Sequence, residues 1–172
     1  DQTTLDTVEW SEKPIVLSHI GARALWESKR LAPDDVLEAV AAKGGVIGIE
    51  CAPHTTLTKN NRAHNLAAFM EHFEYVKSLV GIDHLGFGPD TIYGDHVGLH
   101  HTYMAALSIK DSKGRGPPGQ EYDEVEWVEG LENPTEGSHN IVRWLVKSGY
   151  SDDDIGKVMG GNALRVMREA WA

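Results

Sequence analysis

The chain has 172 residues, a formal net charge of −10 and 41% hydrophobic residues, a composition typical of globular proteins. This negative charge repels a phosphate backbone and no Lys/Arg stripe offsets it locally, so nucleic acid is not an expected partner. No apolar run approaches the roughly 18 residues that a membrane span needs. The single cysteine, Cys51, cannot form an internal disulfide, and a cytoplasmic location is the default expectation.

Three short apolar runs, each ending in a polar residue, predict buried strands at residues 14–19, 45–50 and 84–90. Between the first two, Pro33 and the acidic residues after it begin a predicted helix that Lys43 and Gly44 end. Between the second and third, apolar residues recur at steps of three and four and predict an amphipathic helix over residues 65–80. The order is therefore β-α-β-α-β.

Strands linked by crossover helices lie parallel in one sheet, so their carboxyl ends share one edge. The three predicted strands end at His19, Glu50 and Asp90. We therefore expect these three polar side chains at the sheet edge where α/β folds place their functional sites.

The second half of the chain has a different character. Residues 91–134 carry many Gly, Asp and His residues and predict a long loop with a short helix near residues 99–108. Helical spacing returns at residues 136–148, Ser151 offers a helix cap, and a Gly-Gly-Asn interruption precedes a last helix at residues 163–171.

The length poses a problem for any complete α/β barrel. A (β/α)8 barrel takes roughly 250 residues, and only three strands are evident here. Either the chain is a small open α/β domain with a helical tail, or it is the C-terminal part of a larger fold. The second choice is favoured, because a three-stranded parallel sheet with both edges free exposes unpaired backbone groups.

Three residues are the main candidates for chemistry. His19 closes a strand, where a rigidly held imidazole can bind a metal, although a histidine satisfied by core backbone groups is the alternative. Asp90 follows small, sharply turning residues and could work beside a cation or a proton, or only cap the next loop. Arg30 lies in the loop after the first strand and suits a substrate carboxylate, unless that loop is simply basic and solvated.

The other polar groups carry weaker signals. Glu50 could be a ligand or a base by its position, and Cys51 is expected to be a small buried residue. His96, His100 and His101 match no strong metal-binding spacing, so they are expected to face solvent or a substrate. Two further histidines on the second helix, His64 and His72, are expected at the surface. The Gly-rich segment 114–119 has the letters of a dinucleotide fingerprint but follows no strand and contains two prolines, so we reject it.

Taken together, the motifs resemble the membrane (renal) dipeptidase family of zinc peptidases, in the style of its bacterial members. The resemblance runs along almost the whole chain. It is carried by PIVLSH at 14–19, ARAL at 22–25, Arg30 with PDD at 33–35, GGVIG at 44–48, GFGPD at 86–90, VEGLE at 128–132, and GN at 161–162 with LRV at 164–166.

The resemblance implies a (β/α)8 metallohydrolase barrel with two zinc ions, of which residues 1–172 would form the C-terminal part, a partial catalytic domain. It identifies His19 as a metal ligand, Arg30 as the residue that pairs with the substrate carboxylate, and Asp90 as the acid/base group near the metal-activated water. The other ligands would come from a missing N-terminal half, and residues 1–10 resemble the helix that follows the preceding strand. The family often has a second acid after the residue matching Asp90, and this chain lacks it.

The resulting hypothesis is zinc-dependent hydrolysis of dipeptides, with the isolated chain inactive because zinc needs three or four ligands. A homodimer stays open. Two alternatives remain: a non-catalytic α/β module that binds a small metabolite, and another amidohydrolase-type hydrolase on the same scaffold.

Overall fold

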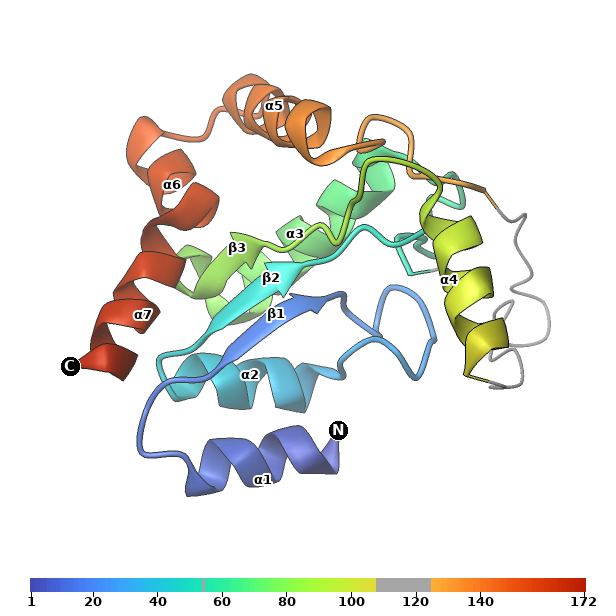
Figure 1. The fold of residues 1–172 in the computed structure, drawn as a ribbon. Coiled ribbons are helices and arrows are strands. Elements are labelled where there is room, and N and C mark those ends of the chain that lie inside the picture. The colour runs from blue at the N-terminus through green and yellow to red at the C-terminus, as the bar shows by residue number, and fades with distance from the viewer. Residues whose placement is uncertain (54, 108–124) are drawn as a thin grey trace.

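The computed structural model describes residues 1–53, 55–107 and 125–172. Its elements follow the predicted alternation in the first half of the chain, and helices fill the second half (Figure 1). Their bounds are α1 (Gln2–Trp10), β1 (Val16–Ile20), α2 (Asp34–Ala42), β2 (Val46–Ile49), α3 (Leu66–Val80), β3 (Leu85–Phe87), α4 (His96–Ala106), α5 (Pro134–Lys147), α6 (Asp152–Gly156) and α7 (Asn162–Trp171), with a 3-10 turn η1 (Ile82–His84) and a π turn η2 (Lys157–Gly161).

The three strands form one parallel sheet in the order β1-β2-β3, as the crossover helices require. Central strand β2 is fully buried, whereas the edge strand β1 alternates between exposed and partly buried residues. The prediction of a buried first strand is therefore wrong for β1, because in this structure no second strand pairs with its free side among the described residues.

Local sequence explains where the helices begin. Asn65 accepts a hydrogen bond from the backbone of Ala68 at the start of α3, and Asn133 does the same for the first turn of α5. Ser151 caps α6 as predicted, since its hydroxyl accepts from the backbone N–H of Asp154 at 3.1 Å. These three helices therefore start at residues whose side chains satisfy free N–H groups, whereas α1, α2 and α7 have no side-chain cap.

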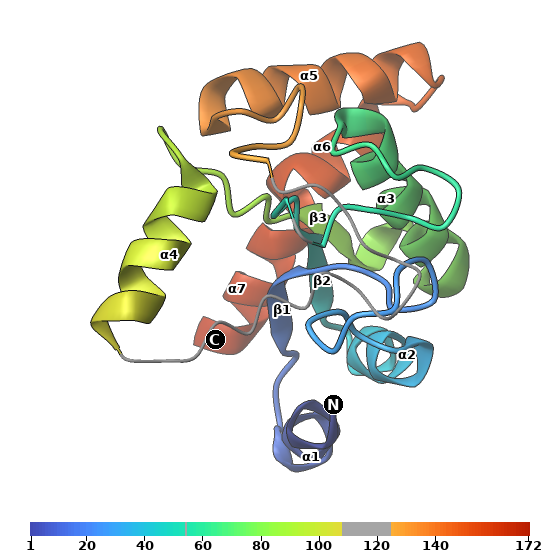
Figure 2. The same cartoon turned by 90° about the vertical axis from the view of Figure 1, so that its right-hand side faces the viewer.

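Helices α2 and α3 lie together on one side of the sheet (Figure 2). Their apolar stripes join β2 and β3 in the main core, which includes Val36, Leu37, Phe69, Phe73 and Ile47. By contrast, α4 lies beyond the carboxyl ends of the strands (Figure 1). The second half of the chain also contributes to the main core, through buried residues such as Leu131, Ile141 and Val158.

The last helices are anchored to the sheet by a buried amide. Asn162 donates two hydrogen bonds of 2.8 Å, to the carbonyl oxygens of Ile82 and Leu85. The predicted Gly-Gly-Asn interruption is confirmed, because Gly160 has a φ of 149° where the backbone kinks before α7. This kink lets α7 return against the start of β3.

Among the described residues of the predicted 91–134 loop there is one helix, α4, which begins three residues before the predicted position. The rejected Gly-rich segment 114–119 lies outside the described residues. No helix among residues 1–53, 55–107 and 125–172 is both long enough and apolar enough to cross a lipid bilayer.

Candidate active site

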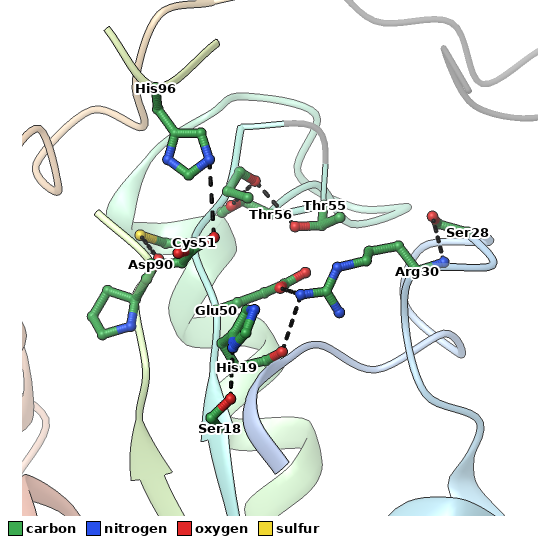
Figure 3. A network of polar contacts seen from close by, with 12 residues as sticks. Ser18, His19, Ser28, Arg30, Glu50, Cys51, Thr55, Thr56, Asp90 and His96 are labelled. Carbon is green, nitrogen blue, oxygen red and sulfur yellow. Dashed lines mark hydrogen bonds and ion pairs between the residues drawn. The ribbon is translucent and has the colours of Figure 1, made fainter. Parts of the chain in front are cut away.

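The carboxyl ends of the strands bring the three main candidates to one edge of the sheet. Figure 3 shows His19, Arg30 and Asp90 in the same region, with Glu50 between His19 and Arg30. The sequence-based expectation that the polar strand ends converge is therefore met in this structure.

Two glycines permit the local shape of this edge. Pairing between β1 and β2 is irregular between Leu17 and Ile20, and the Ser18 carbonyl oxygen there lies over the neighbouring strands. A Cβ atom at either Gly48 or Gly88 would overlap that oxygen. The absence of side chains at both positions therefore allows β1 to turn its last residues, including His19, over the sheet edge.

His19 is partly buried, and one of its ring nitrogens is already in contact. Its Nδ1 atom lies 2.7 Å from the Ser18 hydroxyl oxygen. The imidazole therefore has Nε2 as the nitrogen that remains for a ligand, which is the arrangement that a metal-binding histidine needs.

Arg30 belongs to a loop closed at its base by backbone pairing. Ala32 donates to Gly21 at 3.0 Å, and Arg23 donates to Ala32 at 2.8 Å. From this loop the Arg30 Nη2 atom donates to the His19 carbonyl oxygen at 3.2 Å and lies 2.6 Å from Glu50 Oε2. The guanidinium therefore spans the end of β1 and the end of β2.

Glu50 is buried, with 1% of its side chain exposed, and its partner Arg30 is 38% exposed. Burial raises the Glu50 pKa to about 6, and the charge of Arg30 opposes that rise only in part. The adjacent hydroxyl of Thr55 donates to the Ala52 carbonyl oxygen at 3.1 Å. Arg30 is thus the main group that keeps this carboxylate ionised at neutral pH.

Asp90 lies on the other side of the edge, near His96, a histidine for which the sequence gave only a weak signal. Its φ of 58° is left-handed, a conformation that aspartate tolerates better than most residues. Its Oδ2 atom is 3.9 Å from Nε2 of His96, the first residue of α4. Burial lowers the pKa of His96, and the negative charge of Asp90 opposes this.

Cys51 connects the two sides through the backbone. Its thiol donates to the Pro89 carbonyl oxygen at 2.9 Å, and its N–H donates to the same oxygen at 3.0 Å. Burial raises the thiol pKa strongly. The expectation of a small buried residue holds, since this thiol is not a nucleophile at neutral pH.

The predicted surface position of His72 is wrong. This residue is 1% exposed, accepts from the backbone N–H of Ala22 at 3.1 Å and lies 3.0 Å from the Leu57 carbonyl oxygen. It supports the base of the Arg30 loop. Its position three residues after buried Phe69 placed it on the apolar stripe of α3, so the helical period was the signal that could have found it.

The remaining histidines divide between surface and interior. His100 and His101 are exposed. His64 is partly buried and precedes α3, so its predicted place on the exposed side of that helix is wrong. His96 is buried, which excludes the solvent-facing alternative for it but not contact with a substrate. No sequence spacing signalled His96. A small hollow beside it is lined by Cys51, Thr91, Trp127, Glu132 and six other residues.

The metal-binding capacity of this chain is limited. Among residues 1–53, 55–107 and 125–172, no three His, Cys, Asp or Glu side chains are grouped so that they could hold a metal ion. Structural and catalytic zinc sites use three or four protein ligands. The side chains present therefore fit one corner of a metal site, at His19, and not a whole one.

Comparison with known proteins adds an independent observation. Residues 1–106 and 119–172 match the family model described as membrane dipeptidase (peptidase family M19). The chain is also 29% identical over 154 residues to a protein named dipeptidase aclJ from Aspergillus oryzae. The matched segment makes up 90% of this chain and 29% of that protein.

Solved structures give the same result for the fold. An amidohydrolase from Pseudomonas aeruginosa superposes with a TM-score of 0.78 and 27% identity, covering 98% of this chain and 49% of that one. A metallopeptidase from Rhodobacter sphaeroides, liganded with a phosphinate mimic of the dipeptide L-Ala-D-Ala, has a TM-score of 0.70 and 17% identity. The match covers 99% of this chain and 40% of that one. The chain thus spans about a third to a half of the proteins that it matches.

Proposed function

Because the chain belongs to the membrane dipeptidase family, peptidase family M19, we propose that it supplies part of the active site of a zinc-dependent dipeptidase. The carrying observation is the placement of His19, Arg30 and Asp90 at one edge of the sheet (Figure 3). Residues 1–172 would be the C-terminal part of a (β/α)8 catalytic barrel, and the remaining metal ligands would come from its N-terminal half.

His19 is the proposed ligand of one of two zinc ions. The Ser18 hydroxyl fixes its ring through Nδ1, 2.7 Å away, and leaves Nε2 directed to the ligand. A bound zinc ion activates water and polarises the substrate carbonyl. The role of the protein is to hold the imidazole rigid, because a misplaced ligand weakens metal binding.

Asp90 is the proposed proton-transfer group. Its carboxylate is 43% exposed at the sheet edge, and His96 lies 3.9 Å away. A carboxylate in this position can accept a proton and pass it to the departing amine. Arg30 is proposed to pair with the free carboxylate of the dipeptide, which would limit substrates to short ones.

Two measurements test this proposal. The chain should bind no catalytic zinc and hydrolyse no Ala-Ala alone, whereas the same chain joined to the N-terminal half of its barrel should do both. In the joined protein, His19→Ala should lower zinc content and activity by at least about 100-fold, the range typical of metal-site damage. Asp90→Asn should lower kcat by about 100-fold or more with zinc content unchanged.

The control is Glu38→Gln, on the exposed face of α2, which changes the charge by the same amount as Asp90→Asn. Full activity of the 172-residue chain alone would refute a shared site. Activity that survives a chelator would refute the metal chemistry.

A further inference from the structure

We propose that His96 is a positioning residue for proton transfer: its Nε2 atom holds the Asp90 carboxylate in the place from which that carboxylate acts. This inference deepens the proposed function and rests on it. It adds to the site a residue from α4, the helix that lies beyond the carboxyl ends of the strands (Figure 1).

The first argument is an unmatched polar atom. His96 is 7% exposed, and its Nε2 atom is buried without a hydrogen-bond partner among the described residues. A buried nitrogen in this state costs free energy, so it calls for a partner or a task. Asp90 Oδ2 lies 3.9 Å from it, and Figure 3 shows the ring directed at that residue. Rotation of a half-exposed aspartate side chain can shorten this separation by the roughly 1 Å that a hydrogen bond requires.

The second argument is the contrast with His72, which is also buried. His72 accepts from the backbone N–H of Ala22 at 3.1 Å and lies 3.0 Å from the Leu57 carbonyl oxygen, so backbone groups satisfy both ring nitrogens. Several of its neighbours on α3 are buried with it. Within α4, whose 11 residues the structure describes in full, His96 alone is buried. Core packing and backbone pairing explain His72 and do not explain His96.

The third argument is the rigid frame around the pair. The start of α4 is fixed, because the Asp95 side chain accepts from the backbone N–H of Gly98 at 2.8 Å. A hydrogen bond between Tyr93 and Thr135 ties the segment before α4 to α5. The carboxylate of Asp90 is less confined, since it is 43% exposed. A proton-transfer group works only from a narrow range of positions, so the fixed imidazole is the group that can confine it.

The fourth argument is charge. Burial and the neighbouring ring of His100 lower the pKa of His96, and the charge of Asp90 opposes this. The ring is therefore neutral at neutral pH, and a neutral imidazole donates one N–H without adding a positive charge. It can orient the carboxylate without favouring the ionised form as strongly as a lysine or an arginine would. The carboxylate thus stays able to take up a proton.

The test uses the zinc-loaded joined protein and two substitutions that fill the space of the imidazole. His96→Leu removes the donor, so it should lower kcat for Ala-Ala by about tenfold or more, with KM and zinc content within about twofold of wild type. His96→Gln keeps an N–H donor of similar reach, so its kcat should stay within about threefold of wild type. Steady-state kinetics and metal analysis measure these effects.

His101→Leu is the matched control, because it makes the same change at an exposed residue of the same helix and should leave kcat and KM as in wild type. A wild-type kcat in His96→Leu overturns the proposal. Equal losses of kcat in His96→Leu and His96→Gln overturn it too, since a merely structural histidine would give that result. If circular dichroism shows that His96→Leu is unfolded, His96→Ala replaces it and should show the same loss.

A second readout needs neither metal nor turnover. Crystal structures of the zinc-free joined protein should show one Asp90 rotamer in wild type and in His96→Gln, and a displaced or split side chain in His96→Leu. The same rotamer in all three proteins overturns the proposal.

The two readouts separate this inference from the proposed function. If the wild-type joined protein hydrolyses no dipeptide while the Asp90 rotamer responds to His96→Leu, the proposed function fails and the positioning contact stands. If hydrolysis occurs and depends on Asp90, but His96→Leu changes neither kcat nor the rotamer, the proposed function stands and the positioning role fails.

Discussion

The two sides of the candidate site satisfy their charges differently. On the β1–β2 side, Glu50 and Arg30 form an ion pair of 2.6 Å around a carboxylate that is 1% exposed. On the β3–α4 side, Asp90 is 43% exposed and lies 3.9 Å from His96, whose Nε2 atom is buried without a hydrogen-bond partner. On the β1–β2 side the two charges pair with each other. On the β3–α4 side the carboxylate of Asp90 and Nε2 of His96 are close but not hydrogen-bonded to each other.

This difference concerns how far each pair of groups is already matched. The charges of Arg30 and Glu50 pair with each other, although Arg30 stays 38% exposed. A carboxylate and an imidazole that are close but loosely coupled can still change protonation state. The charged groups of the candidate site thus divide into an ion pair at the end of β2 and a carboxylate–imidazole pair between the end of β3 and the start of α4.

The largest expected effect is a loss of stability from a substitution that pushes the end of β1 away from the other strands. Gly88→Ala places a Cβ against the Ser18 carbonyl oxygen, and backbone atoms cannot move away as a flexible side chain could. We expect a loss of about 2–3 kcal/mol in the free energy of unfolding, the range of overpacking strain. Urea denaturation followed by circular dichroism measures it.

Gly156→Ala is the control, because nothing lies within 4 Å of a Cβ added there and the residue is helical. It should leave stability unchanged or slightly raised. Equal effects of the two substitutions would mean that Ser18 does not lie over the sheet edge in solution.

A smaller expected effect is a pH dependence of the unfolding free energy that comes from Glu50, the buried carboxylate on the β1–β2 side. The Glu50 pKa is about 6 in the folded chain against an ordinary value of 4.5 for glutamate, so the folded state holds more protons than the unfolded state between these pH values. Stability from this group is fully present below pH 4.5 and is lost as pH rises through 6, by at most about 2 kcal/mol.

The measurement is the urea-unfolding free energy at pH 4.5 and pH 7.5 for wild type, Glu50→Gln and Glu38→Gln. The difference between Glu50→Gln and wild type should grow in favour of the variant as pH rises, while Glu38→Gln should run parallel to wild type. A difference that is independent of pH contradicts a raised Glu50 pKa.

The smallest effect concerns the open side. The charge of Asp90 opposes the burial that lowers the pKa of His96, so Asp90→Asn should lower that pKa further. The shift is small because Asp90 is 43% exposed and the two groups are 3.9 Å apart. Proton NMR titration of the His96 ring measures it, and an unchanged or higher pKa would show that the two groups are not coupled.

The comparison also shows how far sequence reasoning reached. Apolar periodicity located the three strands and most helices, with Asn65, Ser151 and the Gly-Gly-Asn break near their observed places. The convergence of His19, Glu50 and Asp90 followed from strand ends in a parallel sheet, and Arg30 was expected in the loop after the first strand. Family resemblance supplied the proposed roles. The Glu50–Arg30 pair was not predicted, although both residues had been noted separately.

What the sequence determined by itself was the order of elements and the edge of the sheet that carries the polar residues. These depend on local period and on the direction of parallel strands. Only the tertiary structure decided that Glu50 faces Arg30, that His72 is buried under the Arg30 loop and that His96 meets Asp90. Such contacts depend on how loops fold back over many residues, and the energy of each depends on burial that no local pattern specifies.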